Sequence, residues 1–309
     1  MNYEYYKIFY YVGKHKNITR AAAELYSSQP AVSRAIRNLE DELGCVLFQR
    51  SKHGVEFTHE GQILFDYVSA GCSQFMRGEE EISKSIDPES GTVHIGTTVT
   101  SMYGFLSDII REFRNVHPKT RFILSTGASN KTMDKVKNGL VDIAFVTTPF
   151  IPSRNLVQAR ILDFSDILIC GGGESYRKLL GRTVSVDELQ NYPFICLEEG
   201  MQFRRHIDDF FEENKIRFAP EIELDGADQI VPFVRQNYGI AFVPEAIARE
   251  ALDRGEVLRI VPEAHPAPRS VYMITNPNHP VTGASREFSR IILQKIRAGG
   301  EAEAECVRS

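Results

Sequence analysis

Residues 18–43 read ITRAAAELYSSQPAVSRAIRNLEDEL, and this stretch decides the fold of the first part of the chain. Its apolar spacing predicts two short helices joined by a tight turn at residues 26–28. Thr19 has the side chain of a helix N-cap, and Pro30 suits the first turn of the second helix because its missing N–H costs nothing there. Together with a helix predicted at residues 5–14, the stretch indicates a helix-turn-helix.

The second of these helices has two different sides. Its apolar residues share one narrow arc of a helical wheel: Val32, Ile36, Leu39 and Leu43. The opposite arc carries Pro30, Ser33, Arg34 and Arg37. We expect the apolar arc to pack and the other arc to face the major groove of DNA, where an arginine binds a guanine edge through two hydrogen bonds. The alternative is an ordinary solvated surface.

A hairpin with a basic tip is predicted directly after this helix. Residues 46–61 read VLFQRSKHGVEFTHEG, in which short apolar segments flank a basic centre. Such a hairpin is the wing of a winged helix, and we expect Arg50 and Lys52 to contact the DNA backbone or the minor groove. The full set of predicted DNA contacts is Thr19, Arg20, Gln29, Pro30, Ser33, Arg34, Arg37, Arg50 and Lys52.

A long helix is predicted at residues 59–88, with Thr58 as its cap. Its apolar residues follow a spacing close to a heptad, which is typical of a helix that packs against another helix. They are Leu64, Val68, Cys72, Phe75, Ile82 and Ile86. We predict dimerisation with a second copy of the chain, through Leu64, Val68, Phe75 and Ile82.

The pattern changes at residue 92 to alternating strands and helices. The predicted strands are 92–98, 121–126, 141–147, 166–170, 194–197, 221–224, 240–243 and 269–275. The predicted helices are 101–116, 131–138, 203–214, 229–236, 245–253 and 281–297. The first five of these elements form a βαβαβ unit, which indicates the α/β class. The tail at 299–309 is expected to be disordered.

Composition and charge support a small DNA-contacting head on a larger body. The chain has 309 residues, of which 42% are hydrophobic and 25% charged, as in soluble proteins of two or three compact units. Its net charge of −5 is uneven, because residues 1–58 carry a net +2 and the remainder −7. We find no apolar run of about 18 residues and no export signal, so we expect a cytoplasmic protein without membrane contact.

The cysteines do not suggest a metal centre. Five are scattered through the chain without a CxxC pair: Cys45, Cys72, Cys170, Cys196 and Cys306. We therefore expect no bound metal and no disulfide framework.

The residues described so far resemble a known family. The matching positions are Ala21, Ala22, Leu25, Ser28, Gln29, Pro30, Ala31, Val32, Ser33, Ile36, Leu39, Glu40, Leu43, Gly44, Leu47, Phe48, Arg50, Thr58 and Gly61. In type and spacing they resemble the signature of the LysR-type transcriptional regulators. The body is similar to the family's effector-binding domain, two α/β lobes like a type II periplasmic binding protein, through NGLVDIA at 138–144 and YGIAFVP at 238–244.

The resemblance implies domain boundaries and an assembly. Residues 1–58 would be a winged helix-turn-helix, 59–88 a linker and dimerisation helix, and 89–309 the effector-binding domain. Lobe I would comprise 89–161 and 269–309, and lobe II 162–268. Members of the family usually form homotetramers arranged as dimers of dimers, so a pseudo-palindromic DNA site is expected.

A small-molecule site is predicted between the lobes. Residues 96–104 read GTTVTSMYG and run from a strand end into a helix start, where hydroxyls and free N–H groups suit an anion. The alternative is that Thr100 or Ser101 only caps the helix. The resemblance favours Thr100 and Ser129. The predicted effector contacts are Thr98, Thr100, Ser101, Ser129, Thr147, Met201, Gln202 and Phe203. A small organic anion is the expected effector, with added positive charge if Arg204 and Arg205 face inward.

A redox role is the less favoured interpretation of two cysteines. Cys170 and Cys196 fall on predicted strands, where a small buried cysteine is common. By the resemblance, Gln202 stands where peroxide-sensing members carry their reactive cysteine. This departure argues against thiol sensing.

The sequence thus predicts a ligand-responsive transcription regulator and not an enzyme. We find no catalytic motif such as GxSxG, HExxH, GxxxxGK[ST] or GxGxxG, and predict no cofactor other than an effector of unknown identity. The expected partners are operator DNA, the effector, further copies of the chain and RNA polymerase. Two alternatives stay open: a small-molecule binding protein without a regulatory role, which a DNA-binding assay excludes, and an enzyme that uses the inter-lobe cleft, which turnover of a bound metabolite establishes.

Overall fold

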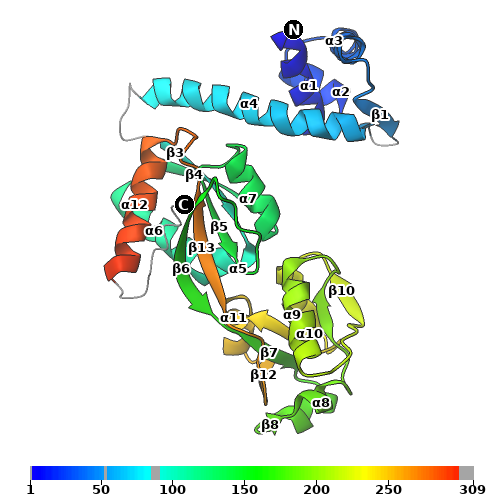
Figure 1. Cartoon of the computed structure of the whole chain (residues 1–309), viewed down its shortest axis with the longest axis vertical. Coiled ribbons are helices and arrows are strands. Elements are labelled where there is room, and N and C mark those ends of the chain that lie inside the picture. The colour runs from blue at the N-terminus through cyan, green and yellow to red at the C-terminus, as the bar shows by residue number, and fades with distance from the viewer. Residues whose placement is uncertain (1, 52–53, 85–90, 299–309) are drawn as a thin grey trace. The chain divides into compact units, whose positions relative to one another are not determined.

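The computed structural model describes residues 2–51, 54–84 and 91–298, and the chain divides into two compact units (Figure 1). The first comprises Met1–Pro88 with Asn138–Leu140, and the second Glu89–Lys137 with Val141–Ser309. The predicted wing tip with Lys52, the end of the long helix with Ile86, and the tail at 299–309 lie outside the described residues.

The first unit begins with three helices, α1 (Tyr3–His15), α2 (Ile18–Glu24) and α3 (Gln29–Leu43). The predicted cap of α2 was wrong. Asn17, not Thr19, has the extended backbone of an N-cap, and its side-chain oxygen accepts from the Arg20 N–H at 3.0 Å. The cap of α3 is Ser28, whose hydroxyl accepts from the Ala31 N–H at 3.4 Å.

The apolar arc of α3 packs as predicted, with one exception. Val32, Ile36 and Leu39 are buried against Phe9 and neighbouring residues of α1 and α2. Leu43 is 42% exposed, because it is the last residue of the helix and lies beyond this core. The predicted packing of Leu43 was therefore wrong.

The wing is an antiparallel hairpin of β1 (Phe48–Ser51) and β2 (Gly54–Phe57). The carboxylate of Glu40 on α3 accepts from the backbone N–H of Leu47 at 2.7 Å, which ties the hairpin to the helix. Thr58 then caps α4 (His59–Lys84) by accepting from the Gly61 N–H at 3.0 Å, as predicted.

The predicted dimerisation stripe of α4 has two parts. Leu64 and Val68 pack against the core that α1, α2 and α3 share, so they are used within the chain. Phe75 and Ile82, farther along the helix, are each 70% exposed. The sequence could not separate the two parts, since both continue the same helical face.

Lobe I of the second unit is built on a five-stranded sheet in the order β4-β3-β5-β13-β6. The strands are β3 (Gly91–Thr97), β4 (Thr120–Thr126), β5 (Ile143–Thr147), β6 (Val157–Phe164) and β13 (Arg269–Thr275). β3, β4 and β5 run parallel, as the βαβαβ pattern predicts, and β13 pairs antiparallel with β5 and β6.

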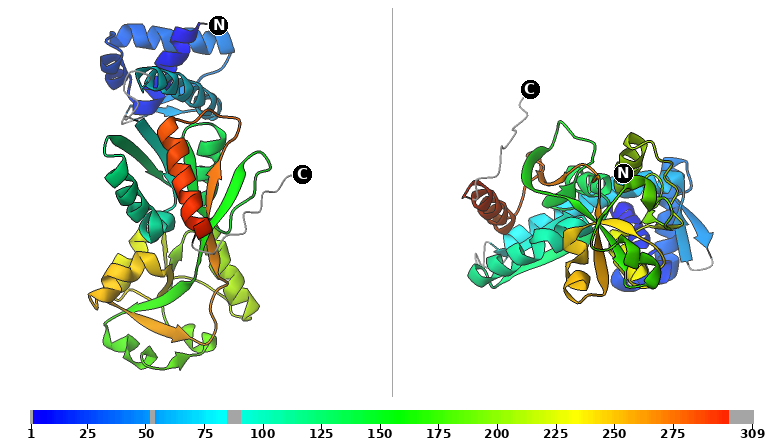
Figure 2. Two further views of the ribbon diagram at one scale, coloured as in Figure 1. Left: turned by 90° about the vertical axis from the view of Figure 1, so that its left-hand side faces the viewer. Right: turned by 90° about the horizontal axis from the view of Figure 1, so that it is seen from below.

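Helices cover both faces of this sheet (Figure 2). The helices are α5 (Val99–Ser101), the π-helical η1 (Met102–Leu106), α6 (Ser107–Val116), α7 (Ser129–Lys137) and α12 (Gly283–Ala298). Alternate strand residues face opposite cores. Ile143 and Phe145 pack with η1, α6 and α12, whereas Ala144 and Val146 pack with α7.

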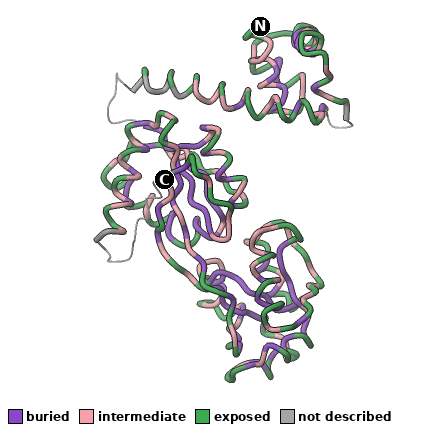
Figure 3. The backbone as a smooth tube through the Cα atoms, in the orientation of Figure 1, coloured by how far each residue is buried: buried purple, intermediate pink, exposed green. Residues whose placement is uncertain are grey.

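Lobe II contains a four-stranded sheet, β11-β7-β12-β8, and a parallel pair, β9 and β10. Its strands are β7 (Asp166–Gly171), β8 (Thr183–Val184), β9 (Ile195–Leu197), β10 (Ile222–Leu224), β11 (Ala241–Pro244) and β12 (Val257–Pro262). Its helices are η2 (Glu174–Leu179), α8 (Val186–Leu189), α9 (Gln202–Glu213), α10 (Ala227–Arg235) and α11 (Glu245–Asp253). Figure 3 shows the buried strands at the centre of each lobe.

Two connections join the lobes. β6 stays paired with β13 as far as Phe164, beyond the predicted lobe limit of 161, and β7 of lobe II begins at Asp166. The second connection leads from β12 back to β13 at Arg269. No helix in the described part of the chain is long and apolar enough to span a bilayer.

Candidate functional site

The predicted DNA-binding surface begins at the exposed arc of α3. Gln29, Pro30, Arg34 and Arg37 are exposed, and Ser33 is half-buried. The rigid backbone beneath them comes from the Ser28 cap and the buried opposite arc. The basic and amide groups are thus held on a fixed helix, which is what major-groove recognition requires.

The other predicted DNA contacts lie on α2 and in the wing, and the structure describes the side chains of only some of them. Thr19 and Arg20 are exposed in the first turn of α2. Arg50 pairs through its backbone with Val55 in the wing, but its side chain lies outside the described residues, as does Lys52.

The two lobes enclose a cleft with a volume of about 250 Å³. Seven of the eight predicted effector contacts line it: Thr98, Thr100, Ser129, Thr147, Met201, Gln202 and Phe203. They come from the ends of β3 and β5 and from the starts of α5, α7 and α9. Residues far apart in sequence therefore meet where several helices begin.

Ser101 does not line the cleft, so its predicted contact was wrong. Its side chain is completely buried, and its hydroxyl lies 2.9 Å from the hydroxyl of Thr98. Thr98 also accepts from the Ser101 N–H at 3.3 Å, which makes Thr98 the cap of this helix. The alternative interpretation, in which Thr100 or Ser101 caps this helix, is therefore wrong for both residues.

Ser129 has a structural task in addition to its place in the cleft. Its hydroxyl donates to the Thr147 carbonyl at 2.8 Å and accepts from the Thr147 N–H at 3.2 Å. These bonds fix the start of α7 against the end of β5. Because the hydroxyl has a single proton, Ser129 can donate to a ligand only by giving up its bond to the Thr147 carbonyl.

A buried ion pair at the cleft was missed by sequence reasoning. Arg269 lines the cleft, is 4% exposed, and donates to both carboxylate oxygens of Asp166 at 2.8 and 2.6 Å. Its guanidinium carbon lies over the rings of Phe164 and Phe203, 4.7 and 4.6 Å from their centroids. His206 Nε2 is 3.7 Å from the same carboxylate. A pair of residues about a hundred positions apart leaves no local signal in the sequence.

Burial affects the protonation of His206. It lowers the pKa of the imidazole below its usual range, and the positive charge of Arg269 lowers this pKa further. The nearby Asp166 carboxylate acts in the opposite direction but does not reverse the shift.

The expected help from Arg204 and Arg205 is not found. Arg204 is buried in lobe II, where it forms ion pairs with Asp208 and Glu223 and donates to the Leu197 carbonyl at 3.2 Å. Neither arginine lines the cleft. The condition under which these two residues would add positive charge to the cleft, that they face inward, is therefore not met.

Lobe II contributes further polar residues that were not predicted. Asp225, Asp228 and Gln229 line the cleft at the start of α10. The Gln229 amide donates to the Asp225 carboxylate at 2.7 Å. In the sequence these residues form a polar run before the helix predicted at 229–236. That run alone does not show that the N-terminus of this helix faces the cleft.

The cysteines on strands are buried as expected. Cys170 is fully buried and Cys196 is 2% exposed. Burial raises the pKa of the Cys170 thiol to about 11 and that of Cys196 to about 12. Both remain protonated near neutral pH, which opposes a redox role because the thiolate is the reactive form.

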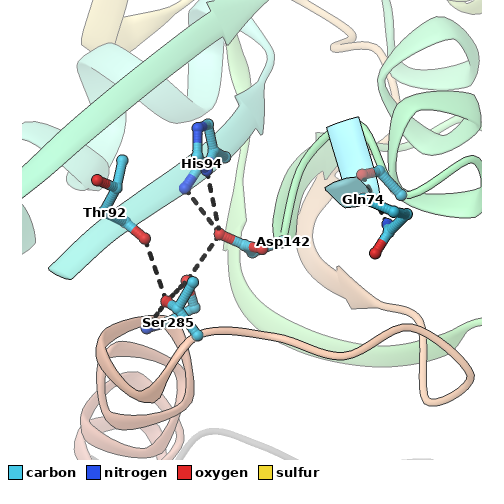
Figure 4. Close-up of polar contacts among 7 residues, drawn as sticks. Gln74, Thr92, His94, Asp142 and Ser285 are labelled. Carbon is cyan, nitrogen blue, oxygen red and sulfur yellow. Dashed lines mark hydrogen bonds and ion pairs between the residues drawn. The ribbon is translucent and has the colours of Figure 1, made fainter. Parts of the chain in front are cut away.

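A polar network supports lobe I at the opposite ends of β3 and β5 (Figure 4). Asp142 accepts from the backbone N–H of His94 at 2.9 Å and from the Ser285 hydroxyl at 2.7 Å. Thr282 donates to the Thr92 carbonyl at 3.1 Å and caps α12 by accepting from the Ser285 N–H. These bonds hold the strands whose other ends form the cleft.

Models of known protein families match both the N-terminal head and the body of this chain. The model of the LysR substrate binding domain matches residues 87–297, and that of the bacterial regulatory helix-turn-helix protein, lysR family, matches residues 4–62. A probable RuBisCO transcriptional regulator of Guillardia theta is 31% identical, over 91% of this chain and 92% of the relative. The transcriptional activator IlvY of Haemophilus influenzae is 27% identical, over 82% and 87%.

The fold also matches a solved full-length structure. The crystal structure of CbnR, a LysR family transcriptional regulator, superposes with a TM-score of 0.73 at 17% identity and covers 96% of this chain and 99% of that one. The two chains thus share the same folds in the same order along the sequence: a helix-turn-helix, a long helix and two α/β lobes.

Proposed function

The chain belongs to the LysR family of transcriptional regulators, and from this premise we propose which of its residues bind DNA, which bind the effector and how the two sites are coupled. The protein is a DNA-binding transcription regulator with an effector-binding domain. The matching families and relatives are transcription regulators and not enzymes.

The exposed arc of α3 reads the operator. Arg34 and Arg37 are its basic residues, Gln29 and Ser33 add hydrogen-bonding groups, and Pro30 gives an apolar contact. The DNA-binding unit is positioned by contacts to the phosphates of the DNA backbone, which come from Thr19, Arg20, Arg50 and Lys52. This assignment rests on the exposure of the described arc and on the general match of such helices to the major groove.

The cleft binds a small organic anion. The single observation that carries this assignment is that α5, α7, α9 and α10 all begin at residues that line the cleft. A helix N-terminus carries roughly half a positive charge and unsatisfied N–H groups. The anionic group belongs on the lobe I side, near the Thr100 hydroxyl and the start of α7 at Ser129, because Asp225 and Asp228 make the lobe II side negative.

The two sites are coupled through the assembly. An effector that binds one lobe closure more tightly shifts the population of closures and so re-orients paired DNA-binding heads. In this proposal two copies of the chain pair through the exposed part of α4, and two such pairs form a homotetramer. The assembled regulator then contacts RNA polymerase. A regulator of operator DNA acts in the cytoplasm, where that DNA is.

The test starts with the full-length chain and a random DNA library. Selection should enrich a pseudo-palindromic sequence, and failure to enrich any sequence would overturn the assigned DNA-reading role. The same chain is then screened by thermal shift against small carboxylates, phosphates and their neutral isosteres. A set of hits without an anion would overturn the anion assignment.

Variants localise the effector. Thr100→Val should abolish the ligand-induced thermal shift, whereas Thr183→Val, on an exposed strand residue outside the cleft, should leave it unchanged. An unchanged shift in Thr100→Val would remove this residue from the effector site.

A further inference from the structure

Tyr26, in the turn between α2 and α3, has an unusual backbone conformation. Its φ of +50° is in the left-handed region. The Tyr26 N–H donates to the Ala23 carbonyl at 3.2 Å, and the Ser27 N–H donates to the Ala22 carbonyl at 2.9 Å. This pair of bonds is the Schellman motif that ends a helix, and the residue in the left-handed position is usually glycine.

A tyrosine is unfavourable at this position. Its Cβ crowds the backbone in the left-handed conformation, where glycine is free of that clash. Burial of the ring does not compensate, because Tyr26 is 99% exposed. Asn237 provides a contrast: it also has a positive φ, but its side chain accepts from the Gly173 N–H at 2.7 Å. Lys16 and Lys215 are exposed and have a positive φ as well, so the backbone conformation alone does not require a partner. The Tyr26 ring, which the fold does not bury, is available for a contact outside the chain.

The position of Tyr26 indicates what it contacts. It lies two residues before Ser28, the cap of α3, and residues 26–31 are all exposed. Tyr26 thus stands in an exposed segment that continues directly into the first residues of the DNA-reading helix, Gln29 and Pro30. A phenolic hydroxyl is a good donor to a phosphate oxygen, and phosphate contacts of this kind fix the register of a protein on the duplex.

We infer that the Tyr26 hydroxyl donates to a backbone phosphate of the operator and thereby positions α3 in the groove. The inference rests on the proposed DNA-reading role of α3. It assigns to Tyr26 a sequence-independent contact, distinct from base reading by Arg34.

The test uses the full-length chain and two labelled duplexes, the sequence selected by the unmodified protein and a random one. Tyr26→Phe removes only the hydroxyl and should weaken binding to both duplexes by the same factor, roughly three- to tenfold. Because the hydroxyl is uncharged, the slope of log affinity against log salt should stay unchanged. Tyr3→Phe is the matched control, since Tyr3 is 74% exposed on α1.

Tyr26→Gly separates binding from folding. Hydrogen exchange of the amides in α2 and α3 should slow, by roughly three- to tenfold, because glycine relieves the left-handed strain. DNA binding should weaken in the same variant. If Tyr26→Gly bound DNA weakly because it folds poorly, hydrogen exchange of the amides in α2 and α3 would become faster instead.

Three outcomes overturn the inference. In the first, Tyr26→Phe binds both duplexes as tightly as the unmodified chain. In the second, only binding to the selected duplex weakens, which assigns the hydroxyl to a base. In the third, DNA binding is intact but transcription of a reporter is lost, which assigns Tyr26 to a protein partner. If the unmodified chain selects no DNA, the proposed DNA-reading role fails before any variant is compared.

Discussion

Arg34 stands on the exposed arc of α3, one helical turn after Pro30, while the opposite side of the helix is buried. A guanidinium on such a helix donates two parallel hydrogen bonds to a guanine edge, and such a pair is worth roughly 1–3 kcal/mol of discrimination. Arg34 is therefore the residue on which we base sequence preference.

Arg34→Ala should lower affinity for the selected operator by about ten- to a hundredfold and affinity for random DNA much less. Fluorescence anisotropy with both duplexes at fixed salt measures this ratio. Arg111→Ala, an exposed arginine of α6, is the control. An equal loss on both duplexes would identify Arg34 as a phosphate contact.

His206 links stability to pH. Its pKa is lowered by burial, so the folded state binds a proton at lower pH than the unfolded state, whose histidine titrates near 6.5. Stability is then complete above about pH 6.5 and falls as the pH drops toward the folded-state pKa.

His206→Gln should flatten the dependence of the unfolding midpoint on pH between about pH 7 and 5. Urea unfolding of the full-length chain at several pH values measures it. His265→Gln, on an exposed histidine, should keep the original dependence. Parallel curves for the His206 variant and the unmodified chain would contradict the assignment.

At the scale of elements, α4 combines two uses of one apolar stripe. Its first part packs on the head through Leu64 and Val68, and its later part presents Phe75 to the surroundings at 70% exposure. The two uses predict different effects of substitution in each part.

Phe75→Asp should abolish self-association with little effect on the stability of the head, because the ring is exposed in the single chain. Leu64→Ala should destabilise the head by about 1–3 kcal/mol, since it leaves space in a packed core. Analytical ultracentrifugation and urea unfolding distinguish the two. A Phe75→Asp chain that still self-associates would move the interface elsewhere.

Strong local patterns predicted some elements to the residue. α11 at Glu245–Asp253 and β13 at Arg269–Thr275 have the predicted bounds. β6 was missed because Arg160 and Asp163 interrupt its apolar pattern, and it is an edge strand that pairs only with β13. β12 was missed as well, because Arg259 and Pro262 interrupt its apolar pattern.

The candidate cleft was predicted where it depends on local chemistry. Thr100 follows a strand end in the hydroxyl-rich segment at 96–104, a pattern that the sequence displays directly, whereas Ser129 was favoured by the family resemblance because the helix was predicted to begin only at residue 131. Arg269 and Asp225 were missed because their place in the cleft depends on how the lobes fold, which no local spacing encodes.

At the scale of the whole second unit, the ion pair of Arg269 and Asp166 stands where the two lobes are joined. Arg269 begins β13 of lobe I, and Asp166 begins β7 of lobe II. Both are almost fully buried, at 4% and 1% exposure. Removing one partner leaves a buried charge without compensation.

Arg269→Met should therefore destabilise the chain by about 3–5 kcal/mol. The double variant Arg269→Met with Asp166→Leu should recover most of this loss, because it removes both charges and keeps apolar volume. Chemical unfolding of the two variants measures the difference. Equal destabilisation in both would show that the ion pair is not the source of the effect.

Gly61, in the first turn of α4, has a consequence for the DNA that this protein recognises. A Cβ at this position would lie 2.0 Å from the Leu47 carbonyl oxygen, so only glycine lets the helix start this close to the segment before the wing. Thr58 adds a hydrogen bond to the Val46 carbonyl at 2.7 Å. The direction in which α4 leaves the head is thereby fixed. When two copies pair through α4, the separation of their recognition helices is fixed as well, and inserting about five base pairs between the two half-sites, half a turn of DNA, rotates one half-site out of reach.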